Sequence, residues 1–314
     1  MNNNAIFHGE YRIERLTIER LKDVRRLHYV LYGKKVSDRF WRRKYDTAYT
    51  EHIYIGFLAY NQANEPVGHY SVLPCFLQYN GQPVLAAQSV DTMTHPEHQK
   101  KGLFFTLATL TFELCIEEGI RLVFGFPNQN SLPGFVKLGW IKAGQLERFT
   151  IPVTTFPLER IVNKALVMRK IYNIYTNLML KKYRLPKAFN LPISENYNGV
   201  LRDTYYFRYK TYSNTYTISV GNAFIWCKIH NGFVIGDMTG FEPDFDQILV
   251  PLKKLSAKLG LRQLHFQVSK QTTLYALLKK YSESMPSFQI MIKDLGSGIA
   301  PGELAFVFAD IDIF

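Results

Sequence analysis

The sequence predicts an α/β fold, with a mixed central sheet flanked by helices, built as two tandem lobes. Strand-like and helix-like segments alternate along residues 53–149, and a similar order recurs over residues 206–281. A chain of 314 residues with 47% hydrophobic content is large enough to fill two cores. We therefore expect lobes at residues 1–156 and 198–314, joined by a basic helical connector at residues 157–197.

The first lobe is expected to open with an amphipathic helix over residues 17–33, whose leucines share one face and which Gly33 ends. Residues 53–60 and 67–73 alternate as antiparallel strands do. The pair Asn80-Gly81 is a strong signal for a tight hairpin. These residues therefore predict a strand meander that leads into a last strand over residues 84–94.

A helix is predicted to begin at Lys101, because leucines then recur at helical spacing as far as Gly119. A strand over residues 121–126 follows at once, and then a short helix near Leu132. A final strand near Phe149 would complete this lobe.

The loop from Thr94 to Gly102 (THPEHQKKG) lies between a predicted strand and a predicted helix. The first turn of a helix presents unpaired N–H groups and the positive end of the helix dipole. Lys100 and Lys101 add positive charge. The loop therefore predicts a phosphate site at the carboxyl end of a strand, although a glycine in a basic turn can also serve the turn alone.

Two segments resemble the GNAT acetyltransferase superfamily. Its phosphate loop commonly reads Val-x-His-Pro-Glu-x-Arg-Gly-Lys-Gly-Ile-Phe, to which residues 94–104 are similar. Gln99 occupies the Arg/Gln position of the pattern, Gly102 keeps its central glycine, and Phe104 replaces a residue that is frequently small. Residues 130–140 (NSLPGFVKLGW) resemble the family's Asn-x-x-x-x-Tyr-x-Lys-Leu-Gly-Phe segment. The two segments also follow each other in the family's order.

The resemblance implies a cleft between two splayed parallel strands that admits acetyl-coenzyme A as the acyl donor. Backbone groups from Asp91 to Thr94 would pair with the pantetheine arm, and amides of the loop would hold the pyrophosphate. The residues so assigned to cofactor binding are Met93, Thr94, Gln99, Lys100, Lys101, Gly102, Leu103, Phe104, Asn130 and Phe135.

The reaction that the resemblance implies is direct attack of an acceptor amine or hydroxyl on the thioester, which needs a base and a proton source for the thiolate. Asp91, His95 and Asn130 are the catalytic candidates, as base, relay and cofactor-orienting residue. Each has a plainer interpretation, namely a lysine partner, a turn cap and a helix cap. The family's proton-donating tyrosine falls at Phe135, which cannot donate a proton.

The predicted second lobe has the same element order as the first. Strands are expected at residues 216–220, 223–230 and 233–239, with Asn231-Gly232 as a hairpin turn. Residues 237–246 stand where the basic loop stood, but they are acidic and would repel a pyrophosphate. We therefore interpret this lobe as a degenerate GNAT-like domain without cofactor binding.

The end of the chain and the helices of the second lobe complete this prediction. Helix, strand and helix are expected at residues 243–260, 263–268 and 272–281. Residues 306–314 (FVFADIDIF) alternate as a terminal strand does, which would place Asp310 and Asp312 on one face.

The net charge of +12 favours anionic partners, but no nucleic-acid-binding motif accompanies the basic runs, so nucleic acid is an unlikely partner. The basic helix expected at residues 157–184 suits an interdomain connector better than its alternative, peripheral membrane contact. The spacing of the cysteines predicts neither disulfides nor a metal site, and no export signal or spanning segment is evident, so a cytoplasmic protein is expected. These cysteines are Cys75, Cys115 and Cys227.

Three functions are compatible with these observations. The leading one is acetyl transfer from acetyl-coenzyme A to a small-molecule amine, such as an amino sugar. The second is a Fem-type aminoacyl transferase acting on a cell-wall precursor, which needs no coenzyme A loop. The third is a non-catalytic acyl-coenzyme A-binding module, which Phe135 favours. The loop from Gln99 to Phe104 favours the first, and the sequence does not predict an oligomeric state.

Overall fold

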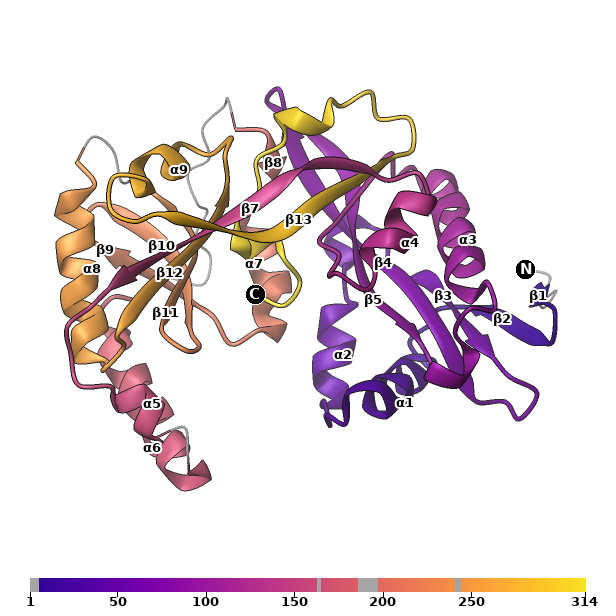
Figure 1. The fold of residues 1–314 in the computed structure, drawn as a ribbon, viewed down its shortest axis with the longest axis horizontal. Coiled ribbons are helices and arrows are strands. Elements are labelled where there is room, and N and C mark those ends of the chain that lie inside the picture. The colour runs from indigo at the N-terminus through magenta and orange to yellow at the C-terminus, as the bar shows by residue number, and fades with distance from the viewer. Residues whose placement is uncertain (1–5, 163–164, 186–196, 241–243) are drawn as a thin grey trace. The chain divides into compact units, whose positions relative to one another are not determined.

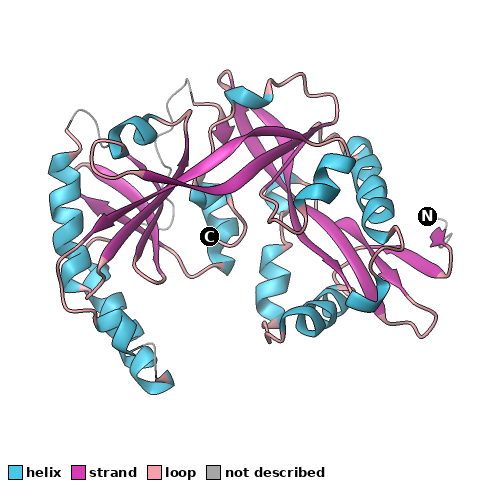
Figure 2. Cartoon of the chain, in the orientation of Figure 1, coloured by secondary structure: helices cyan, strands magenta, loops and turns pink. Residues whose placement is uncertain are grey.

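The computed structural model describes residues 6–162, 165–185, 197–240 and 244–314 and confirms the mixed α/β fold, in which strands and helices both occur throughout (Figure 1, Figure 2). The chain divides into two compact units. Unit 1 comprises Met1–Ala143 and Gln289–Gly302, and unit 2 comprises Gly144–Phe288 and Glu303–Phe314.

Unit 1 contains a sheet in which antiparallel strands give way to a parallel pair. The pairs from β1 to β5 are antiparallel, β5 and β6 are parallel, and the end of β13 pairs antiparallel with β6. The strands in sheet order are β1 (Ile6–His8), β2 (Tyr11–Arg15), β3 (Ile55–Tyr60), β4 (Pro66–Tyr79), β5 (Gln82–Thr94), β6 (Leu122–Gly125) and β13 (Ser284–Asp294).

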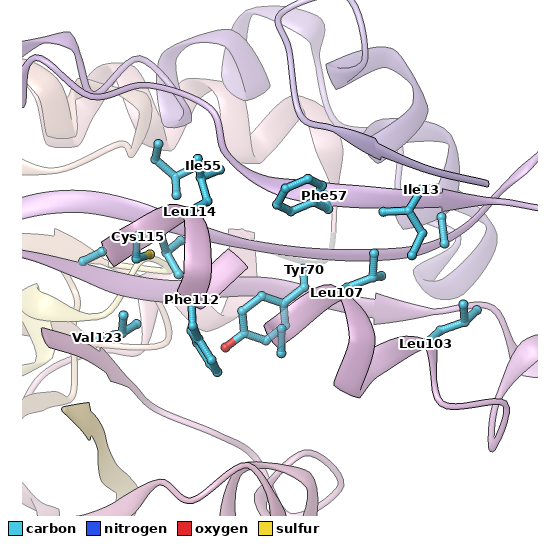
Figure 3. Packing of buried hydrophobic residues seen from close by; sticks show 14 of the residues in the cluster. Ile13, Ile55, Phe57, Tyr70, Leu103, Leu107, Phe112, Leu114, Cys115 and Val123 are labelled. Carbon is cyan, nitrogen blue, oxygen red and sulfur yellow. The ribbon is translucent and has the colours of Figure 1, made fainter. Parts of the chain in front are cut away.

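Helices cover both faces of this sheet, because alternate residues of a strand point to opposite sides. On one face Tyr70 of β4 packs with Leu107 and Phe112 of α3, as Figure 3 shows. On the other face Leu73 of β4 belongs to a cluster with Trp41 of α2. The helices of unit 1 are α1 (Leu21–Tyr32), α2 (Asp38–Lys44), α3 (Leu103–Glu117) and α4 (Leu132–Lys137).

Unit 2 contains the strand order β13-β7-β12-β11-β10-β9, with β11 and β12 parallel. Its strands are β7 (Ile141–Pro152) from Gly144 onward, β8 (Gly199–Val200), β9 (Tyr216–Val220), β10 (Ala223–Ile229), β11 (Phe233–Thr239), β12 (Gln263–Ser269) and the beginning of β13. Its helices are α5 (Leu158–Val162), α6 (Leu166–Lys181), α7 (Thr204–Tyr209), α8 (Asp246–Lys258) and α9 (Thr273–Leu278).

The two units are not the contiguous segments that the sequence suggested. The strand near Phe149 exists, but residues 146–152 of β7 pair with β12 and lie in unit 2. Residues 291–294, from near the end of the chain, pair with β6 of unit 1 instead. The segment expected as a connector, residues 157–197, belongs to unit 2 where the structure describes it, and residues 163–164 and 186–196 lie outside the described residues.

The predicted terminal strand over residues 306–314 is wrong. The last strand of the described chain is β13, and residues 308–310 form a 3₁₀ turn. Asp310 holds this turn because its carboxylate accepts a hydrogen bond from the backbone N–H of Val307 at 2.7 Å and pairs with Arg202. Asp310 is therefore buried in a cap and an ion pair instead of sharing a strand face with Asp312. Of the acidic loop at residues 237–246, residues 241–243 lie outside the described part.

Two expectations drawn from composition can be compared with the structure. All three cysteines, Cys75, Cys115 and Cys227, are buried free thiols. In the described part of the chain, no helix combines the length and the apolar character needed to cross a bilayer.

Candidate functional site

The parallel strands β5 and β6 separate soon after they meet. Their register pairs Ala87 with Val123 and Gln88 with Phe124, and β6 ends at Gly125. Strand β5 continues as far as Thr94. Beyond Gln88, the edge of β5 that faced β6 is therefore not paired with that strand, and an extended ligand can hydrogen-bond to such an edge.

A β-bulge distorts β5 within this unpaired stretch. His69 of β4 pairs with Met93, and Ser71 pairs with Val90, so that Asp91 and Thr92 together face one residue of β4. Asp91 has a φ of 48°, which is uncommon for a residue other than glycine. A bulge bends its strand and redirects a side chain, and bulges are frequent beside active sites.

The bulge directs the Asp91 carboxylate to α2. Its oxygens lie 2.8 Å from Lys44 Nζ and 2.8 Å from Tyr45 Oη, and Tyr45 Oη lies 2.9 Å from Ser71 Oγ. Burial acts to raise the pKa of Asp91, but Lys44 outweighs it and holds this pKa below its ordinary value. An ionised carboxylate that is paired with lysine is a weak base, so this geometry favours a positioning role for Asp91.

His69 carries a buried ring nitrogen without a partner. Its Nδ1 lies 2.8 Å from the backbone oxygen of Asp91, which can only accept, so Nδ1 carries the proton. Nε2 is then a free lone pair, and it has no hydrogen-bond partner among the described residues. Burial lowers the pKa of His69, so the ring is neutral at pH 7. His69 was not among the sequence candidates, although a histidine within the apolar run VGHYSVL was a usable signal.

The loop after β5 leads into an uncapped helix. His95 Nδ1 accepts a long hydrogen bond of 3.4 Å from the backbone of Glu97 and thus caps the 3₁₀ turn Pro96–His98. Lys100 has a φ of 62° and Gly102 a φ of 79°. Gly102 is the N-cap of α3 and supplies no side-chain cap, so the first-turn N–H groups of this helix are available to an anion.

Strand β1 lies beside this loop. His8 Nε2 is 3.0 Å from the backbone oxygen of Lys101, and His8 Nδ1 is 3.1 Å from Thr106 Oγ1 of α3. A Cβ placed on Gly102 would lie 3.1 Å from the same Nε2. Gly102 is therefore required both by its left-handed backbone and by its close neighbour.

Phe104 and Phe135 form an aromatic wall beside the separated strands. Their rings stack with centroids 6.3 Å apart, and Phe135 also packs on Trp140 at 4.5 Å. A Cβ on Gly134 would lie 2.6 Å from the Phe104 ring, so glycine at this position makes room for the larger residue at Phe104. Glycine at position 134 thus explains how the loop accommodates Phe104, where the GNAT loop pattern frequently has a small residue.

A pair of hydroxyl groups lies where β5 and β6 separate. Ser89 Oγ donates to Tyr70 Oη at 3.0 Å, and burial raises the pKa of Tyr70. A Cβ on Gly125 would lie 3.1 Å from the Phe135 ring and 3.4 Å from Ser89 Cβ, so the three residues adjoin one another. The structure thus places two hydroxyl groups close to the ring that cannot donate a proton.

Asn130 lies exposed in the turn before α4. The side chain that organises this turn is Asn128, whose Oδ1 accepts from the backbone N–H groups of Asn130 at 2.9 Å and Ser131 at 3.0 Å. Asn128 orders this turn but does not cap α4, whose N-cap is Ser131 without a side-chain cap hydrogen bond. The cofactor-orienting role of Asn130 stays a prediction.

A cavity of about 680 Å³ lies elsewhere, in unit 2. Glu159 lines it, and its carboxylate already accepts from the backbone N–H of Gly232 at 2.8 Å. None of the loop or strand features described above lines this cavity. We place the candidate site in unit 1, because the free nitrogen of His69, the hydroxyl pair of Tyr70 and Ser89, and the uncapped N-terminus of α3 all belong to that unit.

Comparison with known proteins gives one family match. Residues 12–143 match the family model described as an acetyltransferase (GNAT) domain. No curated protein matches the sequence.

Solved structures show the same fold at low sequence identity. A probable N-acyltransferase from Enterococcus faecalis is 12% identical with a TM-score of 0.59, covering 91% of this chain and 73% of its own. A putative acetyltransferase from Pyrococcus horikoshii is 11% identical with a TM-score of 0.57, covering 98% of this chain and 96% of its own. N-myristoyltransferase from Saccharomyces cerevisiae, solved with bound myristoyl-CoA, is 10% identical with a TM-score of 0.56, covering 93% and 81%.

The matched segment contains the whole of the candidate site, from Lys44 of α2 to Phe135 of α4. It also contains the bulged strand, the loop and the uncapped helix that were found from the residues themselves. Residues 12–143 therefore form a domain of the GNAT acetyltransferase family.

Proposed function

We propose that this chain transfers an acetyl group from acetyl-coenzyme A to the amine of a small-molecule acceptor, such as an amino sugar. The observation that carries the proposal is the unpaired, bulged end of β5, which runs directly into the loop before the uncapped α3. An extended thiol arm and a pyrophosphate need these two features in this order. The acyl-transferase family of residues 12–143 supports it.

The residues of this region fit such a donor. The pantetheine arm would follow the backbone from Asp91 to Thr94, and the pyrophosphate would meet the amides from Gln99 to Phe104. Lys100 and Lys101 bring positive charge to the loop. The aromatic wall of Phe104 and Phe135 would provide the apolar side of the donor site.

The reaction requires a base and an acid, and the site offers one of each. The acceptor nitrogen attacks the thioester carbonyl, a C–N bond forms and the C–S bond breaks. His69 accepts the proton that leaves the nitrogen, because its neutral Nε2 has a free lone pair. Tyr70 gives its proton to the departing thiolate, and Ser89 Oγ, which donates to Tyr70 Oη, stabilises the phenolate oxygen until water restores the proton. Lys44 and Tyr45 hold Asp91, whose backbone oxygen fixes the tautomer of His69.

A non-catalytic acyl-coenzyme A-binding module is the alternative that a specific observation favours. Phe135 is 4% exposed and packed between Phe104 and Trp140, and it has no proton to give. The alternative predicts binding of the donor without turnover.

Two measurements on the full chain test the proposal. Calorimetric titration with acetyl-coenzyme A should show one site per chain. A thiol-reactive dye should then report release of coenzyme A when amines, amino sugars among them, are added. Binding without thiol release for any amine would support the module, and no binding to a folded chain would contradict both.

Tyr70→Phe should lower kcat by about 10²-fold with KM for acetyl-coenzyme A unchanged, since it removes one proton donor and keeps the ring. The phenylalanine ring preserves the contacts with Phe104 and Phe112 at 5.8 Å, so the fold should persist. Tyr172→Phe is the matched control, because that buried hydroxyl donates to the backbone oxygen of Leu259 in unit 2 at 2.8 Å. Equal losses in the two variants would contradict a proton-donor role.

His69→Gln should remove one ionisation from the pH profile of kcat/KM. With an acceptor amine whose pKa is well above 7, a plot of log(kcat/KM) against pH should have a slope of one near neutrality, because only the amine still has to lose a proton. Burial lowers the pKa of His69 below its ordinary 6.5, so the slope should steepen to two only at a more acid pH. In His69→Gln the rate should fall by about 10²-fold or more and the slope should stay at one. A profile that steepens in the variant as well would exclude His69 as the base.

A further inference from the structure

Helix α6 (Leu166–Lys181) extends from unit 2 at the lower left of Figure 1. Residues 166–171 are exposed, and from Tyr172 onward the helix buries one face. Tyr172, Thr176 and Leu180 are the buried residues of this helix. The hydroxyl of Tyr172 donates to the backbone oxygen of Leu259 at 2.8 Å, and that of Tyr175 to the backbone oxygen of Lys258 at 2.6 Å. These contacts fix how the helix is rotated about its axis.

The outward face of α6 is apolar along its whole length. Val167, Ile171, Ile174 and Leu178 are 69%, 62%, 62% and 65% exposed. Their spacing of four, three and four residues places them in one stripe of a helix. Leu166 and Met168, which are 71% and 45% exposed, extend the apolar surface at its beginning. We call this surface the α6 stripe. Soluble proteins rarely expose a contiguous apolar surface without a function for it.

The charges around the α6 stripe are all positive. Residues 166–184 include no aspartate or glutamate and five basic residues. At about 100° per residue, Lys170 and Lys181 lie along one margin of the stripe, and Lys182 follows its end. The other basic residues of the segment are Arg169 and Arg184.

We propose that α6 is an interfacial helix that binds this protein to the surface of an anionic lipid bilayer. A helix that lies in the interface between lipid headgroups and acyl chains has an apolar face flanked by lysines. The α6 stripe has this pattern, and residues 166–184 contain no acidic residue. The lysines would meet lipid phosphates, to which polybasic segments are attracted within a Debye length. Docking of a second copy through the same face is disfavoured, because it would bring like charges together.

The binding would be peripheral and would act through two separable contributions. The apolar side chains of the α6 stripe stabilise the bound state by moving from water into the bilayer, and the lysines stabilise it by attraction to anionic headgroups. Removing two stripe side chains should therefore weaken vesicle binding by about 100-fold, and reversing two lysines should weaken it only on anionic vesicles. This inference does not depend on the proposed acetyl transfer, since it concerns a different surface and needs no turnover.

Vesicle flotation with the full chain tests it. The protein should float with vesicles of phosphatidylcholine and phosphatidylglycerol, less with phosphatidylcholine alone, and less when salt is raised. Ile171→Ser/Ile174→Ser should abolish flotation, whereas Val250→Ser/Met285→Ser, which changes two residues 50% and 59% exposed elsewhere in unit 2, should not. Lys170→Glu/Lys181→Glu should remove the preference for anionic lipid, and the exposed control pair Lys279→Glu/Lys280→Glu should keep it.

Two results would overturn the proposal. One is absence of flotation with anionic vesicles, which would leave an acidic protein as the better partner for this face. The other is a dimer in sedimentation that Ile171→Ser/Ile174→Ser dissociates, which would show that a second copy covers the α6 stripe. All four replaced stripe and margin positions are exposed, so circular dichroism should show the variants folded.

Discussion

Gly102→Asp should reduce the affinity for acetyl-coenzyme A by about 100-fold or more. The new carboxylate would lie at the N-terminus of α3, where we propose that the pyrophosphate binds, and would repel the pyrophosphate. It would also satisfy first-turn N–H groups that the donor otherwise binds. Calorimetric titration of the wild type and the variant measures the difference.

Gly119→Asp is a matched control at the other end of the same helix. Gly119 has a φ of 78° against 79° for Gly102, and a Cβ there would meet nothing within 4 Å. Gly119→Asp should lose about 1–2 kcal/mol of unfolding free energy, because a side chain disfavours the left-handed conformation. Gly102→Asp should lose somewhat more, because its Cβ would also lie 3.1 Å from His8 Nε2. If Gly119→Asp weakened binding as much as Gly102→Asp, backbone strain and not the anion site would be the cause.

Arg202→Met should destabilise unit 2 by about 3–5 kcal/mol. Arg202 is 2% exposed and pairs with Asp310, which is 1% exposed, and with Asp237 at 2.9 Å. Removing the cation leaves two carboxylates buried without their counter-charge. Urea denaturation followed by tryptophan fluorescence measures the loss, in a background where Trp41 and Trp140 of unit 1 are replaced by phenylalanine so that the signal comes from Trp226 of unit 2.

The pH dependence of this loss is predicted as well. Burial raises the pKa of both Asp310 and Asp237, and Arg202 opposes that effect. Without Arg202 their folded pKa rises further above the unfolded value of about 3.9, so protonated carboxyls favour the folded state. The loss of unfolding free energy in Arg202→Met, relative to the wild type, should be small below pH ~3.9. It should grow as the pH rises through the pKa values that Asp237 and Asp310 have in the folded variant.

Arg208→Met is the control for Arg202→Met, because Arg208 is exposed on the nearby helix α7. Its unfolding free energy should change by about 0.5 kcal/mol or less. The charge-free variant Arg202→Met/Asp237→Asn/Asp310→Leu should recover part of the stability that Arg202→Met loses. An Arg202→Met protein as stable as the wild type at pH 7 would contradict the ion-pair account.

Local features of the fold could be predicted from the sequence. The turn at Asn80-Gly81 has positive φ at both residues, as its hairpin sequence requires. Asn231-Gly232 likewise connects β10 to β11. Gly33 ends α1 with a left-handed cap at a φ of 63°. Short-range backbone chemistry decides these features, so neighbouring residues are sufficient evidence for them.

Long-range pairing could not be predicted in the same way. Residues 291–294 pair with β6, although some 170 residues separate them, whereas the alternating segment at 306–314 forms a turn instead of a strand. The contact of Lys44 with Asp91 depends on a β-bulge that the neighbouring residues of the sequence did not predict. The same holds for His69, whose role follows only from its bond to the Asp91 backbone.

Part of the predicted site still rests on the sequence. The loop from Gln99 to Phe104 lies at the N-terminus of α3 as its residues suggested, and the family match covers it. The contacts of individual residues with the donor stay predictions. So does the interpretation of unit 2 as a degenerate copy of the same fold, although its strands and helices follow the expected order as far as α9.

Amide hydrogen exchange with and without acetyl-coenzyme A reports which backbone segments the donor protects, so it locates the donor site in the full chain. We expect slower exchange for peptides covering Thr92 to Thr106, with no change for the peptides of α8 and β11 in unit 2. Unchanged exchange from Thr92 to Thr106 at saturating donor, or protection confined to unit 2, would contradict this donor site.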